Sequence, residues 1–118
     1  MLDRFGPAAV AAVIIASSAL ASHAGRADAP AAPTVHVRIS NYAFKDPSIT
    51  VARGTTVVWQ NSDDDPHTVT AVDGSFDSHG LGNGDTYSHR FDTSGTFQYY
   101  CKVHPFMKGV VIVQGAQP

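Results

Sequence analysis

Apolar and polar side chains alternate along much of the chain, which is the pattern of half-buried β-strands. Val35, Val37 and Ile39 are separated by the polar His36 and Arg38, so the aliphatic side chains should share one face of a strand. Similar alternation, or runs of β-branched and aromatic residues, predicts six further strands. These strands cover residues 49–51, 55–60, 67–72, 86–91, 96–100 and 108–113.

Turn signals separate the predicted strands. Arg53-Gly54, Asp73-Gly74 and the stretch from Asp92 to Gly95 carry the residue types that favour tight turns. Residues 76–85 have no sustained pattern and are expected to form an irregular connection. No segment shows helical periodicity of useful length. The pattern therefore predicts an all-β domain, an antiparallel β-sandwich of seven or eight strands.

The start of the chain predicts export. Arg4 precedes an apolar run rich in Ala, Val and Ile, and the small residues Ser22 and Ala24 come shortly before Gly25. This organisation is typical of a secretory signal peptide, and we expect residues 1–24 to direct the protein to the periplasm. The alternative is an uncleaved membrane anchor, because the apolar stretch approaches the roughly 18 to 20 residues that span a bilayer.

A single domain is expected after the leader. Residues 25–33 are small and Pro-rich, which predicts a flexible tether, and residues 34–115 form the domain. The chain of 118 residues leaves no room for a second domain.

The charge pattern excludes a nucleic-acid partner. The formal net charge is −2, the chain has no Glu, and its Lys and Arg residues form no clustered basic face. The one charge run is Asp63-Asp64-Asp65. It is interpreted either as a solvated turn or as a docking patch for a basic partner, because it lies just before His67.

One cysteine in an exported chain requires an explanation. Cys101 cannot form an internal disulfide, so it is either buried and inert or held as a thiolate by a metal. His104 and Met107 follow it at intervals of three residues, and His67, after Pro66, is a candidate for a second imidazole. Two His, one Cys and a weak Met ligand form the donor set of blue-copper electron-transfer sites.

Each candidate ligand also has a simpler interpretation. Cys101 could be a structural thiol, His67 an ordinary loop histidine and His104 a surface histidine without function. Met107 could fill a gap in the core, which is what methionine does more often. These alternatives leave the regular spacing of the three C-terminal candidates unexplained.

Three motifs carry a resemblance to a known family. They are Trp59-x-Asn61 followed by Pro66-His67, then Asp92-x-x-Gly95-x-Phe97-x-Tyr99-x-Cys101, and Cys101-x-x-His104-Pro105-Phe106-Met107. The chain resembles the cupredoxins, and within them the amicyanin and plastocyanin group of small copper proteins. The short gap between His104 and Met107 is similar to amicyanins.

The resemblance implies a Greek-key cupredoxin-like sandwich that binds one copper ion, cycling between Cu(I) and Cu(II), through His67, Cys101, His104 and Met107. It implies a monomeric type 1 copper protein that shuttles single electrons and is not an enzyme. Its partners would be transient redox proteins, a dehydrogenase or cytochrome as donor and a cytochrome or oxidase as acceptor. The alternative function is copper storage, delivery or resistance with the same ligands. No membrane partner is expected once the signal peptide is removed.

The residues around the predicted ligands are also expected to have roles in electron transfer and in supporting the Cys101 sulfur. His104 should expose an imidazole edge as the electron port. Phe106 either forms an apolar docking surface there with Pro105 or tucks inward as part of the core. By resemblance, Asn61 ties the ligand loops together and offers its backbone N–H to the Cys101 sulfur. Val103 stands where relatives often have Pro, and its N–H is expected to give that sulfur a second hydrogen bond.

Three histidines outside the motifs are not expected to bind the copper. His36 should point outward from its strand, and His89 should be solvated or pair across strands. His79 is expected to be a plain loop residue, with a weak surface metal site as the alternative. His23 should leave with the signal peptide.

Overall fold

The computed structural model describes residues 32–115, which form a β-sandwich of seven strands and no helix. The strands are β1 (Thr34–Ile39), β2 (Ser48–Ala52), β3 (Thr55–Asn61), β4 (Thr70–Ala71), β5 (Thr86–Phe91), β6 (Gly95–Tyr100) and β7 (Lys108–Gln114). The predicted signal peptide, most of the tether and His23 lie outside the described residues. Within those residues no helix is long and apolar enough to cross a membrane.

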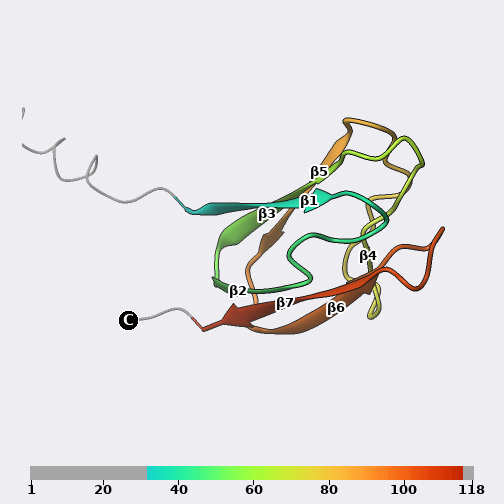
Figure 1. Cartoon of the computed structure of the whole chain (residues 1–118). Coiled ribbons are helices and arrows are strands. Elements are labelled where there is room, and N and C mark those ends of the chain that lie inside the picture. The colour runs from blue at the N-terminus through green and yellow to red at the C-terminus, as the bar shows by residue number, and fades with distance from the viewer. Residues whose placement is uncertain (1–31, 116–118) are drawn as a thin grey trace, which may run out of the picture. The chain divides into compact units, whose positions relative to one another are not determined.

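Two sheets face each other (Figure 1). One has the strand order β1-β3-β5 and the other the order β2-β7-β6-β4. The alternation predicted for β1 is confirmed, because Val37 and Ile39 are buried while His36 and Arg38 are exposed. The all-β sandwich predicted from the sequence is therefore the observed architecture.

The predicted β-sandwich is confirmed, but its sheets are mixed and not antiparallel throughout. β1 pairs with β3 in parallel, and β2 pairs with β7 in parallel, whereas the remaining three pairings are antiparallel. The reason is that β2 joins the opposite sheet, so the chain crosses the sandwich between β1 and β3 and returns in the same direction. Parallel neighbours require such a crossover, and residue alternation does not reveal it.

The strand predicted at residues 67–72 is much shorter than expected. Only Thr70–Ala71 forms β4, while His67 and Thr70 make isolated bridges to Leu81 and Asp77. The irregular connection at residues 76–85 runs back alongside this segment and contacts it through these two isolated bridges. His67 is thereby held in a loop, by backbone hydrogen bonds with Leu81 in both directions.

Trp59 lies at the centre of the core and is fully buried. The rings of Phe76 and Tyr87 stack beside it, and those of Phe91 and Tyr99 meet it edge-on. These contacts join β3 and β5 of one sheet to β6 of the other and to the irregular connection. The ligand loops at the end of the sandwich therefore rest on a rigid aromatic cluster.

The Tyr99 hydroxyl is buried without a hydrogen-bond partner among the described residues. Burial raises the pKa of Tyr99 to about 12. The nearby Trp59 indole N–H opposes this rise in part, but its position does not allow a hydrogen bond to the Tyr99 hydroxyl. We expect Tyr99→Phe to be as stable as the wild type, or more stable by about 1 kcal/mol, because it removes an unsatisfied buried group. Urea denaturation of both proteins checks this, and a clear loss of stability would show that the hydroxyl has a partner.

Candidate metal centre

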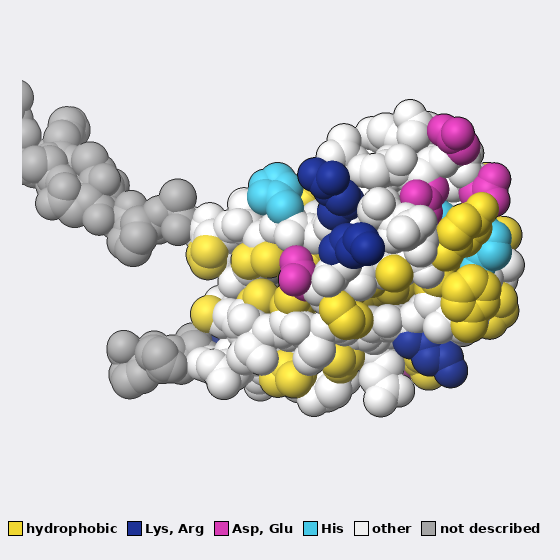
Figure 2. Space-filling model, viewed as in Figure 1, with side chains coloured by type: hydrophobic (Ala, Val, Ile, Leu, Met, Phe, Trp, Pro, Cys, Tyr) yellow, Lys and Arg dark blue, Asp and Glu magenta, His cyan; other side chains and the backbone are white. Residues whose placement is uncertain are grey.

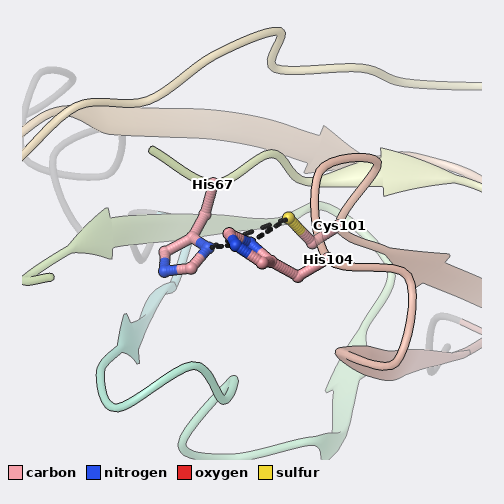
Figure 3. Close-up of side chains that lie close together, drawn as sticks. All are labelled: His67, Cys101 and His104. Carbon is pink, nitrogen blue, oxygen red and sulfur yellow. Dashed lines mark hydrogen bonds between the residues drawn. The ribbon is translucent and has the colours of Figure 1, made fainter. Parts of the chain in front are cut away.

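Three side chains from two loops meet at one end of the sandwich. His67 lies between β3 and β4, Cys101 directly follows β6, and His104 lies in the loop to β7. Their ligand atoms point toward one another (Figure 3). His67 Nδ1 and His104 Nδ1 are 3.1 Å apart, and each is 3.8 Å from Cys101 Sγ. The structure thus brings together residues that are 34 and 37 positions apart in sequence.

The three atoms form a triangle that fits a metal ion. A point equidistant from them lies about 2.1 Å from each, close to typical metal–imidazole distances of about 2.0–2.1 Å and metal–thiolate distances of about 2.3 Å. His67 and Cys101 are fully buried, and His104 is half-buried. Among the described residues this is the one group of three or more His, Cys, Asp or Glu side chains arranged to hold a metal.

Met107 is buried at the end of the same short loop. The Cys101 N–H donates to the Met107 carbonyl at 3.1 Å, and the Met107 N–H donates to the His104 carbonyl at 2.9 Å. These two bonds close the loop from Cys101 to Met107 into a compact turn. The thioether is therefore carried by the same rigid segment as the thiolate and one imidazole.

The sulfur receives its hydrogen bond from a residue that the sequence analysis did not identify. The Thr68 N–H donates to Cys101 Sγ at 3.3 Å, and the Thr68 hydroxyl accepts from the Lys102 N–H at 2.8 Å. Thr68 directly follows His67 in the sequence. Residues next to a candidate ligand often support the site, and this position could have predicted its role. Thr68 joins the two loops and orients the Cys101 sulfur.

The expected donors to the sulfur are wrong. The Asn61 N–H donates to the Asp85 carbonyl at 3.0 Å, and Val103 makes no hydrogen bond to Sγ among the described residues. Val103 is instead half exposed at the surface. The Asn61 side chain does brace a loop, because Nδ2 donates to the carbonyls of Asp65 and Leu81, both at 2.9 Å.

The acidic run before His67 is not simply a solvated turn. The Asp63 carboxylate accepts hydrogen bonds from the backbone N–H groups of Asn41 and Tyr42, and lies 2.9 Å from His67 Nε2. Burial alone would raise the pKa of Asp63, but these bonds hold it below its usual value. Asp65 accepts from the Tyr42 hydroxyl, so two of the three carboxylates have internal partners.

The histidines outside the motifs lie apart from this cluster. His36 is exposed, as expected, and His79 is an exposed loop residue about 4.0 Å from Asp77. Of the two alternatives for His89, a solvated residue or a cross-strand partner, the first is wrong, because its ring packs against Phe76 and Phe91. Burial lowers the pKa of His89. It is a half-buried packing residue opposite Val57 on β3.

Lys102 anchors the cysteine loop to the irregular connection. Its ammonium group lies 2.7 Å from Asp77, whose carboxylate also accepts from the Thr70 hydroxyl and the His79 N–H. The hydrogen bond from Lys102, followed by that from the His79 N–H, lowers the pKa of Asp77 from 3.8 to about 2.

The lowered pKa predicts a pH-dependent stability difference. Because the folded pKa is depressed, the stabilisation is present above about pH 4 and is lost as the pH falls through about 2. We expect Asp77→Asn to cost about 1 kcal/mol at pH 7, after allowing for solvent screening of a partly exposed pair. Urea denaturation at pH 7 and near pH 2 checks this. A cost that stays the same at both pH values would contradict it.

Comparison with known proteins identifies the family. A family model described as a cupredoxin-like domain matches residues 8–113. Amicyanin-alpha of Methylorubrum extorquens is 37% identical over 114 residues, covering 91% of this chain and 95% of that protein. The chain belongs to the cupredoxin family. The family resemblance read from the sequence motifs is therefore confirmed.

Other relatives agree with the amicyanin and plastocyanin group. Plastocyanin of Scenedesmus fuscus is 33% identical over 60% of this chain and 86% of that protein. Among solved structures, a variant of amicyanin in the Cu(I) form superposes with a TM-score of 0.66 and 30% identity, over 69% of this chain and 82% of that one.

Two exposed aromatic side chains of this cupredoxin lie next to the metal centre, one of them hydrogen-bonded to the exposed Asp65. Phe106 is 68% exposed with its ring 6.0 Å from that of His104, and Tyr42 is 43% exposed with its ring 5.2 Å from the same imidazole. Figure 2 shows hydrophobic side chains gathered beside a histidine at the end of the molecule that carries the loops. The half-buried imidazole of His104 is thus framed by two exposed aromatic rings.

Proposed function

We propose that the protein is a type 1 copper protein that shuttles single electrons, with one copper ion held by His67, Cys101, His104 and Met107. The observation that carries the proposal is the convergence of two imidazole nitrogens and one thiolate on a triangle of metal-binding size. Such a site binds both Cu(II) and Cu(I), so copper can gain or lose one electron with little rearrangement.

The protein supplies a rigid and closed site. His67 and Cys101 are fully buried, the loop from Cys101 to Met107 is closed by two backbone bonds, and Thr68 fixes the sulfur. Four protein ligands leave no open position for a substrate, in contrast to catalytic metal sites. We therefore propose an electron carrier and not an enzyme.

His104 is the proposed electron port. It is the half-buried member of the ligand set, and the exposed rings of Tyr42 and Phe106 border it. Exposed aromatic rings beside a metal ligand suit brief contact with a redox protein, a dehydrogenase or cytochrome as donor and a cytochrome or oxidase as acceptor, since such encounters use small interfaces. The relatives named above support this class of partner, and we place the monomeric carrier in the periplasm after signal cleavage.

A redox titration distinguishes the electron carrier from a protein for copper storage, delivery or resistance. The copper-loaded protein is oxidised and reduced repeatedly while the visible spectrum and the bound copper are measured. The proposal expects a reversible one-electron couple with copper retained through every cycle. Loss of copper on reduction, or transfer of Cu(I) to a chelator within one cycle, would favour copper delivery.

A further inference from the structure

The Asp63 carboxylate is held by three donors from two separate loops. Oδ1 accepts from the Asn41 N–H at 2.7 Å, and Oδ2 accepts from the Tyr42 N–H at 2.9 Å. The same Oδ2 lies 2.9 Å from His67 Nε2. The carboxylate is only 15% exposed, so little water competes for these bonds.

The two backbone donors come from an unusual turn. Asn41 and Tyr42 have φ values of 59° and 58°, a left-handed conformation that non-glycine residues adopt at a cost of about 1–3 kcal/mol each. Two successive N–H groups that point at one acceptor form an anion-binding concavity. Here that concavity binds the Asp63 carboxylate, which stabilises the turn.

The same turn places an aromatic ring against the metal centre. The Tyr42 ring meets the imidazoles of His67 and His104 edge-on, at centroid distances of 5.4 and 5.2 Å. Its hydroxyl donates to Asp65, which fixes the other end of the ring. The carboxylate of Asp63 therefore sets the position of both a ligand imidazole and the ring that covers it.

The geometry also assigns the His67 tautomer. Nδ1 faces Cys101 Sγ and His104 Nδ1, so it must be unprotonated to bind a metal. The proton then resides on Nε2, from which it is donated to Asp63. A carboxylate acceptor makes the ligand imidazole more basic, and a more basic ligand favours Cu(II) over Cu(I).

We propose that Asp63 is a positioning residue for the copper site, which orients the His67 imidazole, fixes its tautomer and lowers the reduction potential. This inference rests on the proposed copper site. It assigns Asp63 a role that differs from that of its neighbours in the acidic run, although all three have the same side chain.

The test compares Asp63→Asn with Asp64→Asn in the copper-loaded protein. Both variants remove one negative charge from the same loop, but Asp64 is exposed and makes no hydrogen bond among the described residues. For Asp63→Asn we expect at least about a tenfold loss of Cu(II) affinity relative to Cu(I) affinity, by analogy with other outer partners of ligand histidines. Tenfold corresponds to about 59 mV upward for a one-electron couple. Asp64→Asn should shift the potential much less.

A second measurement keeps the proposal testable if Asp63→Asn does not load copper. In the diamagnetic Cu(I) wild type, the His67 Nε2 proton should give an NMR signal that exchanges slowly with water. The proposal is overturned if this signal is absent, or if both variants have the same potential while only Asp63→Asn loses stability. If the wild type itself forms no blue, reversible copper site, the proposed function fails, which is a separate outcome.

Discussion

Cys101→Ser is expected to abolish the intense blue colour of the Cu(II) protein. Cys101 Sγ is the one thiolate at the site, 3.8 Å from each imidazole nitrogen, and a hydroxyl does not replace it as a soft, ionised ligand. Cu(II) affinity should fall by more than about 100-fold, since loss of a direct ligand should exceed the loss of about 10- to 100-fold for an outer partner. Titration with Cu(II), followed by visible absorption and EPR, measures both effects.

A control variant shows whether the colour comes from this site. His79→Asn removes an exposed histidine outside the cluster and keeps a residue type that tolerates its positive φ of 60°. It should leave the spectrum and the affinity unchanged. Retention of the blue band in Cys101→Ser, or its loss in His79→Asn, would place the copper elsewhere.

Gly109→Ala is expected to destabilise the fold severely. Gly109 pairs with Tyr99 across β7 and β6, and a Cβ at this position would lie 2.3 Å from the Tyr99 ring. The ring is buried and packs edge-on against Phe44 and Trp59, so moving it away from the new Cβ would disturb these contacts. Overpacking a core costs about 1–3 kcal/mol and occasionally more, and we expect at least about 3 kcal/mol here.

Two comparisons isolate the contact between Gly109 and Tyr99. Gly80→Ala should change stability by less than about 0.5 kcal/mol, because a Cβ there has no neighbour within 4 Å. In the double variant with Tyr99→Leu, the cost of Gly109→Ala should fall, since the two residues contact each other. Urea denaturation of the wild type, the three single variants and the double variant measures these differences. Equal costs of Gly109→Ala with and without the Tyr99 ring would contradict the account.

Local patterns in the sequence predicted most of the strands but not their partners, and they overestimated the strand at residues 67–72. The alternation around Val37 fixed which face of β1 is buried, because strand periodicity depends only on neighbouring residues. The parallel pairing of β1 with β3 depends on a crossover through the other sheet, which no local pattern contains. Phe97, two residues before the buried Tyr99 on β6, is half-buried and packs against the core.

The residues of the metal cluster were found from the sequence because their types and spacing are chemically unusual. His67, Cys101 and His104 do converge. Met107, three residues after His104 in the sequence, is buried. Their supporting residues were missed or misassigned. Thr68 acts through its backbone N–H, which reaches Cys101 33 positions away in sequence. Asp63 acts through its contact with the loop at Asn41, 22 positions away. Neither contact can be read from the local sequence.

X-ray absorption at the copper edge of the wild-type protein, loaded with one equivalent of copper, tests the central claim most directly. We expect two nitrogen ligands and one sulfur ligand at short distance, with a second sulfur farther away. The same set should remain after reduction to Cu(I). A copper ion surrounded only by nitrogen and oxygen, with no short bond to sulfur, would contradict the assignment of Cys101 and with it the proposed function.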